Sequence, residues 1–214
     1  MEFKFSNRIS GVQGSAIREI FKYGNRPEVI SLAGGNPAPE LFPSKEFAEI
    51  LAEILAKKPT EALQYGVTEG YAPLREYVKK FIAEREDIGR DFDETIIVSG
   101  GQQGIDLATK VLVNEGDAVI VEEPSFIGAL NAFRAYGAKL VGVPVKNDGM
   151  DIEILEKKLN ETENVKIIYT IPTFQNPSGV TMSAEKRKKL YALAKKHGVV
   201  IIEDNPYGEL TFDG

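Results

Sequence analysis

The sequence contains no cysteine and only one histidine, His197. Without cysteine the chain forms no disulfide, offers no thiolate nucleophile and provides no cysteine-ligated metal site. A single histidine likewise argues against a histidine-rich metal site. No run of about 18 apolar residues predicts a membrane span, and Met1 to Ser10 lacks the apolar segment of a signal peptide. These absences favour a soluble, cytoplasmic protein that binds no metal.

Positive charge is scarce relative to negative charge. The sequence has 26 lysines and arginines against 32 aspartates and glutamates, for a net charge of −6. A nucleic-acid-binding protein typically has a basic face, so this balance argues against a nucleic-acid partner. Hydrophobic residues make up 43% of the 214 residues and charged residues 27%, as in a globular protein with a sizeable core. The length suits one large domain, alone or with a small second one.

The first 43 residues have little regular pattern. Glycines and prolines recur along residues 1–43, which predicts an arm with several turns. One short helix is expected over 15–23, where Ile17, Ile20 and Phe21 share a face.

A helical segment is expected over residues 44–93. Ser44 is a candidate N-cap for an amphipathic helix over 44–57, because apolar residues follow it at helical spacing. Pro59 ends that pattern. A second amphipathic helix is expected over 70–84. This segment would lead into a larger domain that begins at residue 94.

From residue 94 to 214, short apolar runs alternate with longer amphipathic segments. The apolar runs predict strands over 95–98, 118–121, 139–143, 165–171 and 199–202. The segments between them predict helices over 102–113, 125–136 and 151–159, and a further helix capped by Ser183. Alternation of strands and helices implies an α/β domain with a largely parallel sheet and helices on both faces.

The run at 199–202 ends in a carboxylate. Its consecutive β-branched residues predict a strand buried on both faces, and Pro206 fixes the end because proline cannot donate to a β-ladder. Open α/β sheets bind ligands just beyond the carboxyl ends of their strands. Asp204 therefore stands where a carboxylate would face a ligand, unless it is a solvated or capping carboxylate.

Three other strand ends are followed by residues suited to ligand binding. Ser99–Gly104 is a glycine-rich turn before a helix, which suits a phosphate or is simply a tight turn. Phe126 opens a helix, as a core aromatic or as part of a site. Asn176 precedes a Pro-Ser-Gly turn, where turn formation alone would account for it. Together with Asp204, these features would converge in one crevice, which favours a binding site.

Several segments resemble the motifs of one enzyme family. Residues 176–179, Asn-Pro-Ser-Gly, are similar to the N-P-[TS]-G motif of class I/II aminotransferases, and 203–207 resembles their E-D-x-P-Y motif. Residues 99–103 resemble their phosphate turn, and 31–43 and 63–70 resemble their N-terminal segments. The resemblance covers nearly the whole chain and points to the 2-aminoadipate, kynurenine and aromatic aminotransferase branch. It implies the large domain of fold type I, here truncated.

The resemblance also implies pyridoxal 5′-phosphate as cofactor and gives roles to residues around its ring. Asp204 would pair with the pyridine nitrogen and keep it protonated, which makes the ring an electron sink. Asn176 and Tyr207 would hydrogen-bond the 3′-oxygen of the ring, and Phe126 would stack on its face. Asp204 and Tyr207 are the catalytic residues that the resemblance implies in this chain.

Phosphate and substrate contacts follow from the same resemblance. The cofactor phosphate would be held by the backbone of Gly100, Gly101 and Gln102. Tyr65 would reach the cofactor of a neighbouring subunit, which implies a homodimer. The substrate would be contacted by Arg18, Gly35 and Asn176. The implied substrates are a 2-oxo acid and an amino acid with an acidic, aromatic or branched side chain, with no nucleic acid or membrane as partner.

One residue that this chemistry needs is not found in the sequence. Family members carry a Schiff-base lysine in an S-x-S-K-type motif after E-D-x-P-Y, but the sequence ends at Gly214. Its helical lysines, Lys110, Lys186, Lys188 and Lys189, are expected on solvated faces. We therefore interpret the chain as the N-terminal portion of an aminotransferase, inactive alone. The alternatives are a lyase or synthase with the same fold and cofactor, and a non-catalytic sensor domain.

Overall fold

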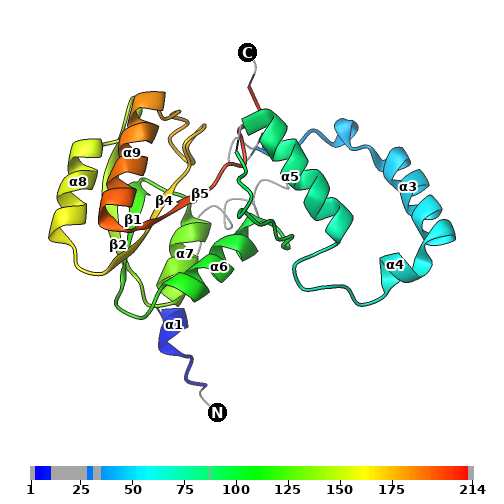
Figure 1. Cartoon of the computed structure of the whole chain (residues 1–214), viewed down its shortest axis with the longest axis horizontal. Helices are drawn as coiled ribbons and strands as arrows, with labels where there is room; N and C mark the ends of the chain where they lie inside the picture. The colour runs from blue at the N-terminus through cyan, green and yellow to red at the C-terminus, as the bar shows by residue number, and fades with distance from the viewer. Residues whose placement is uncertain (1–2, 11–27, 31–34, 87, 212–214) are drawn as a thin grey trace. The chain divides into compact units, whose positions relative to one another are not determined.

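The computed structural model describes residues 3–10, 28–30, 35–86 and 88–211 (Figure 1). The chain divides into two compact units, a sheet unit of residues 1–14 and 99–214 and a helical unit of residues 15–98. The helix predicted over 15–23 lies outside the described residues. Within the described ranges, no helix is long and apolar enough to cross a membrane.

A twisted sheet forms the centre of the sheet unit. Its strands in the described residues are β1 (Ala118–Glu123), β2 (Lys139–Lys146), β3 (Gly149–Met150), β4 (Val165–Thr170) and β5 (Val200–Glu203). They follow the order β3-β2-β1-β4-β5. β1, β2, β4 and β5 run parallel, whereas β3 pairs antiparallel with β2. The predicted α/β class with a mainly parallel sheet is therefore confirmed.

Helices cover both faces of this sheet (Figure 1). The helices of the sheet unit are α1 (Asn7–Ser10), α6 (Gly101–Leu112), α7 (Ile127–Ala135), α8 (Ile152–Glu161) and α9 (Ala184–His197). Helices α6 and α7 pack on one face, and α8 and α9 pack on the other. Helix α7 connects the parallel neighbours β1 and β2 and covers one face, whereas α9 connects β4 and β5 and covers the other.

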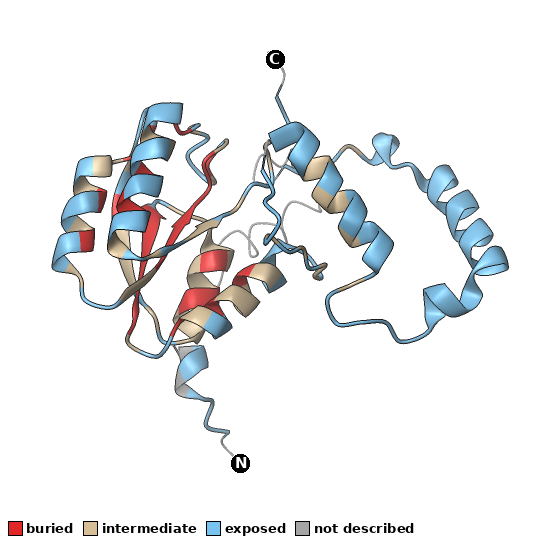
Figure 2. Ribbon diagram, in the orientation of Figure 1, coloured by how far each residue is buried: buried red, intermediate tan, exposed pale blue. Residues whose placement is uncertain are grey.

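Two apolar cores result, because side chains along a strand point alternately to opposite faces. Val119 and Val121 of β1 join the core beneath α6 and α7, whereas Ile120 between them joins the core beneath α8 and α9. In the first core, the rings of Phe133 and Tyr169 meet edge to face with centroids 5.5 Å apart. Figure 2 shows the buried residues concentrated in the strands and on the inner sides of these helices.

Local signals explain where two helices begin and end. Ser183 caps α9 as predicted, since its hydroxyl accepts a hydrogen bond from the N–H of Lys186. Gly198 ends the same helix in a left-handed conformation with φ of 65°, which glycine adopts without steric cost. Asp151 caps α8 by accepting from the N–H groups of Glu153 and Ile154.

The predicted strand over 95–98 is wrong. These residues belong to the helical unit and form no strand. Ile97 donates a backbone hydrogen bond to Glu69, and Arg75 donates through Nε to the carbonyl of Thr95. An apolar run becomes a strand only where a neighbouring strand can pair with it, and no described strand lies beside this one. The sheet instead gains β3, which is too short for its pattern to be seen.

Burial of the run at 199–202 on both faces is also wrong. β5 is an edge strand that pairs only with β4 among the described strands. Val200 is 44% exposed, and Ile201 and Ile202 are only partly buried. The apolar composition predicted the strand correctly, but its burial depends on whether a further element lies beside it.

None of the described helices of the helical unit has a buried residue. Its described elements are η1 (Pro39–Leu41), α3 (Ser44–Lys57), α4 (Pro59–Leu63) and α5 (Ala72–Glu86). The expected N-cap is wrong, because Ser44 is the first residue of α3 and Pro43 occupies the cap position without a side-chain bond. Pro59 not only follows the end of α3 but begins α4, where its fixed φ suits the first turn.

Truncating Leu155 tests the packing of the sheet unit. Leu155 of α8 is fully buried, so Leu155→Ala is expected to lower the free energy of unfolding by about 2–5 kcal/mol through lost burial and a cavity. Val111 of α6 is 80% exposed, and Val111→Ala should change the same quantity by less than about 0.5 kcal/mol. Urea unfolding followed by circular dichroism measures both. Equal losses would contradict the assignment of the core.

Candidate functional site

Asp204 lies directly beyond the end of β5, next to the end of β4. Its backbone N–H donates to the carbonyl of Thr170 at 3.0 Å, which continues the pairing of β4 with β5 by one residue. The Tyr169 hydroxyl donates to Asp204 Oδ2 at 2.7 Å. No described residue bonds the other carboxylate oxygen, Oδ1, and the side chain is only partly buried. Asp204 is therefore held through one oxygen and has the other available for a ligand.

Tyr169 is a permanent donor to this carboxylate. Burial of its ring raises the pKa of the Tyr169 hydroxyl well above its usual value, and the hydrogen bond to Asp204 raises it further. The phenol therefore keeps its proton wherever the protein is folded. A hydrogen bond from a buried neutral donor fixes the orientation of the carboxylate without neutralising its charge.

Asn176 and Tyr207 lie together on the same side of the site. The Asn176 amide nitrogen donates to the Tyr207 hydroxyl over 3.5 Å, a long hydrogen bond that leaves both groups room to bind something else. Both residues line a pocket of about 430 Å³ with Phe174, Gln175, Pro177, Gly179 and Leu210. The structure thus brings together two of the residues expected at one edge of the ring.

The glycine turn before α6 has the geometry of an anion site. Gly100 has φ of 85°, which favours glycine, and a Cβ added to Gly100 or Gly101 would meet no atom of the described residues within 4 Å. The first helical hydrogen bond is donated by Gln103 to Gly100, so the N–H groups of Gly101 and Gln102 lie before it. Open space beside unpaired N–H groups at the positive end of a helix suits a phosphate.

Phe126 and Gln102 meet above Gly128, at the start of α7. The Gln102 side-chain amide donates to the Gly128 carbonyl at 3.0 Å. A Cβ added to Gly128 would collide with both the Phe126 ring and the Gln102 side chain. Glycine at this position therefore lets the aromatic ring lie beside the phosphate turn. Phe126 is only partly buried, so its ring is not a core residue alone.

A buried carboxylate, Glu122, was missed by sequence reasoning. It lies in β1 with only 2% of its surface exposed and accepts hydrogen bonds from Thr170 Oγ1, the Ile171 N–H and Gln175 Nε2 at 2.8, 3.0 and 3.2 Å. Burial raises the pKa of Glu122, although these hydrogen bonds oppose that shift. The available signal was a glutamate that directly follows four apolar strand residues.

Two other predicted site residues, Tyr65 and Gly35, belong to the helical unit. Tyr65 is fully exposed in the helical unit, and Gly35 of the same unit has no atom within 4 Å of an added Cβ. Arg18 lies outside the described residues. In the described part of the chain, no group of three or more metal-binding side chains occurs.

Most of the lysines are placed as expected, with one exception. Lys110, Lys188 and Lys189 are exposed. Lys186 is not simply solvated, because its partly buried ammonium pairs with Asp148 at 2.7 Å and donates to the Gly149 carbonyl at 3.1 Å. These bonds tie α9 to the turn between β2 and β3, which gives Lys186 a structural role.

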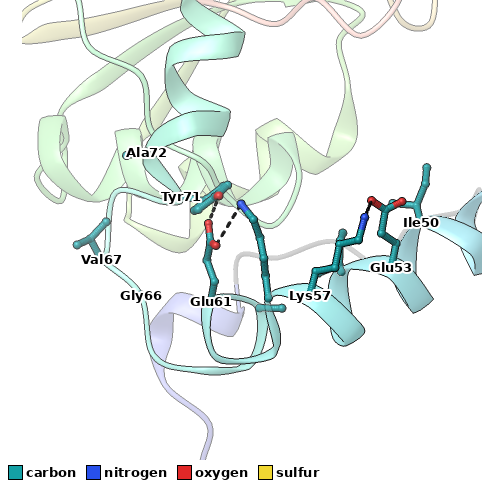
Figure 3. A pocket seen from close by; sticks show the side chains of 11 residues that line it. Ile50, Glu53, Lys57, Glu61, Gly66, Val67, Tyr71 and Ala72 are labelled. Carbon is teal, nitrogen blue, oxygen red and sulfur yellow. Dashed lines mark hydrogen bonds and ion pairs between the residues drawn. The ribbon is translucent and has the colours of Figure 1, made fainter.

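A second pocket, of about 660 Å³, lies within the helical unit (Figure 3). Residues of α3, α4 and α5 line it, and Glu61 binds both Tyr71 and Lys58 at its edge. None of the predicted site residues lines this pocket. The predicted residues of the sheet unit lie instead beyond the ends of β4 and β5, at the start of α6 and directly before α7.

The sheet unit is an α/β domain with a glycine turn at the start of α6 and a carboxylate directly beyond β5. Comparison with known proteins makes this class specific. The chain belongs to the aminotransferase class I and II family, whose model matches residues 27–214.

Individual relatives agree with this assignment. The chain is 46% identical to aromatic-amino-acid aminotransferase 1 of Thermococcus litoralis over 98% of its length, and 43% identical to 2-aminoadipate transaminase of Thermus thermophilus over 97%. It superposes with a TM-score of 0.90 on the crystal structure of Pyrococcus horikoshii kynurenine aminotransferase in complex with PMP, at 43% identity and over 98% of the chain. The chain spans 51% of each of the two curated relatives and 53% of the solved one.

The resemblance and the fold type read from the sequence are therefore confirmed. The motifs that carried them lie at the carboxyl ends of β4 and β5 and at the start of α6. Because β4 and β5 pair in parallel, their carboxyl ends lie side by side at one edge of the sheet.

The raised pKa of the buried Tyr169 hydroxyl predicts a specific pH dependence of stability. Because folding raises the pKa of the Tyr169 hydroxyl, its contribution to stability is complete below the unfolded pKa of about 10 and is lost as the pH rises above it. The unmodified chain should therefore lose up to about 1.4 kcal/mol more per pH unit above that value than Tyr169→Phe. Urea unfolding at pH 8 to 11, a range set by the tyrosine pKa of about 10, measures both. Parallel stability curves would contradict the assignment.

Proposed function

We propose that the protein formed with this chain is a pyridoxal-phosphate-dependent aminotransferase. It moves an amino group between an amino acid with an acidic, aromatic or branched side chain and a 2-oxo acid. The single observation that carries this proposal is the half-buried Asp204 carboxylate, fixed by Tyr169 through one oxygen at the strand end that the family motif occupies. Residues 94–214 would form the first part of the cofactor-binding domain.

The residues at the site fit the cofactor. The open glycine turn at Gly100 and Gly101 suits its phosphate, and the partly buried Phe126 beside that turn suits an aromatic ring. The Asn176 amide and the Tyr207 hydroxyl suit a ring oxygen. Their mutual hydrogen bond is long, so each group could instead form a shorter hydrogen bond with that oxygen. When bound, the cofactor supplies an electron sink for the carbanion formed at the substrate Cα.

Asp204 would keep the pyridine nitrogen protonated. Its free oxygen, Oδ1, would accept a hydrogen bond from the protonated nitrogen, while the Tyr169 hydroxyl donates to Oδ2. An ion pair with a hydrogen bond is strongest where water is partly excluded, and Asp204 is partly buried. Asn176 would orient the ring and border the substrate, and the N–H groups of Gly101 and Gln102 would hold the phosphate.

The names of the relatives support the choice of substrate class. They are an aromatic-amino-acid aminotransferase, a 2-aminoadipate transaminase and a kynurenine aminotransferase. We propose that Gly35 and Arg18 contact the substrate.

Pyridoxamine 5′-phosphate tests the role of Asp204, because this form of the cofactor needs no lysine for binding. Asp204→Asn should weaken its binding to the chain roughly ten- to hundredfold, since the charge-assisted hydrogen bond to the ring nitrogen is lost. A titration followed by ¹H–¹⁵N NMR spectra measures this. The matched control is Glu156→Gln, which removes one negative charge from the exposed face of α8. Equal affinity of the Asp204→Asn chain and its control would refute the role.

We further propose that the protein is a homodimer. The apolar face of α3 supports this, since Phe47, Ile50 and Leu51 are each more than half exposed. A contiguous exposed apolar face of this kind is typical of an interaction surface. Tyr65, fully exposed in the loop after α4, would reach the cofactor of the partner subunit.

A charge on this face should dissociate the dimer. Leu51→Glu is expected to shift the protein to the mass of a monomer in analytical ultracentrifugation, because it would bury a carboxylate without a partner. Ala56→Glu places the same charge on the polar side of α3 and should leave the mass unchanged. A monomeric unmodified protein, or an unchanged mass for Leu51→Glu, would rule out this interface.

A further inference from the structure

The loop that carries Asn176 has a backbone conformation that needs support. It runs from the end of β4 to the start of α9, over residues 171–183. Phe174, two residues before Asn176, has φ of 48°, in the left-handed region that a bulky side chain rarely adopts. Such a conformation persists only where surrounding contacts determine it. The contacts around Gln175 provide that support.

Gln175 uses every polar group that it has to shape this loop. Its side-chain nitrogen donates to Glu122 Oε2 at 3.2 Å and to the Pro124 carbonyl at 2.8 Å, and its side-chain oxygen accepts from the Ser178 N–H at 2.9 Å. Its backbone carbonyl accepts from the Gly179 N–H at 2.6 Å. These bonds close the turn around Asn176 and attach it to the end of β1.

Glu122 of β1 supports the loop through further hydrogen bonds. It accepts from Gln175 and from the Ile171 N–H through one oxygen, Oε2, and from Thr170 through the other, Oε1. Both Glu122 and Gln175 are only 2% exposed. Glu122 does not line the pocket, and the side-chain amide of Gln175, which does, is bonded to Glu122, Pro124 and Ser178, so neither is suited to contact a reacting atom.

We propose that Glu122 and Gln175 are positioning residues, which set the orientation of Asn176 toward Tyr207 and the cofactor ring. This inference rests on the proposed function, since it assigns Asn176 to the ring oxygen. Burying a carboxylate and an amide is costly unless each bond is made, and here the bonds lead to the loop that carries Asn176. The orientation of the Gln175 amide is defined, because its oxygen must face Ser178 and its nitrogen Pro124.

The direct test replaces Gln175 by glutamate. Gln175→Glu keeps the shape and the acceptor for Ser178, but it removes the donor to Pro124 and places two carboxylates side by side. The matched control is Thr170→Val. Valine has the same shape as threonine, and the substitution removes a hydrogen bond that β4, rather than the loop, donates to Glu122. Gln175→Met, which is uncharged and of similar length, serves if the glutamate variant does not fold.

Two measurements on the 214-residue chain separate positioning from general stability. The first is the nuclear Overhauser effect between the Asn176 side-chain amide and the Tyr207 ring, together with hydrogen exchange at Ser178 and Gly179. The second is the affinity for pyridoxamine 5′-phosphate. Gln175→Glu should abolish the first signal, speed exchange and weaken binding about tenfold, as expected for one misplaced hydrogen bond. Thr170→Val should preserve the Overhauser signal, the slow exchange and the affinity.

The outcomes distinguish this inference from the proposed function. If Gln175 variants keep the Asn176–Tyr207 signal and slow exchange, or if Thr170→Val disturbs them equally, the positioning role is wrong. If pyridoxamine 5′-phosphate shifts no signal of Asn176 or Tyr207 in the unmodified chain, the proposed function is wrong. The exchange and Overhauser data then still decide whether Glu122 and Gln175 shape the loop.

Discussion

The hydrogen bond from the Asp204 N–H to the Thr170 carbonyl is the interaction on which the site depends. It continues the parallel pairing of β4 with β5 by one residue beyond the last strand position. Because that pairing fixes the register, the Asp204 carboxylate comes to lie against the Tyr169 hydroxyl of the neighbouring strand. A slip of one residue would turn Asp204 to the opposite face of the sheet and away from Tyr169.

A cluster of buried polar groups extends this arrangement from β4 to β1. Glu122 of β1 accepts a hydrogen bond from the loop after β4, and Tyr169 of β4 donates a hydrogen bond to Asp204 after β5. Three neighbouring strand ends are thus linked by hydrogen bonds in a region of low dielectric constant, where an unpaired group would be costly. The polar cluster and the two apolar cores serve different ends, since the cores stabilise the sheet and the cluster fixes what emerges from its edge.

The sequence was sufficient for those features that depend on local pattern. Alternating apolar runs and amphipathic segments predicted the α/β class, Ser183 predicted a cap, and the motifs at 176–179 and 203–207 predicted the family. The sequence was insufficient where strand formation or burial depends on a neighbouring element. An apolar run at 95–98 found no strand to pair with, and the burial of Glu122 depends on β4 and the loop after it, whose groups donate to its carboxylate.

The edge position of β5 gives ligand binding a structural consequence. β5 has one pairing partner among the described strands and side chains that are only partly buried, so less is lost when it opens than when β1 or β4 opens. A ligand held by both Asp204 and the start of α6 would join this strand to a helix that packs on one face of the sheet. Since such a ligand binds only the closed arrangement, it would stabilise β5 in proportion to its affinity. Asp204, the residue that we propose the cofactor needs most, thus directly follows the strand whose stability would increase most when the cofactor binds.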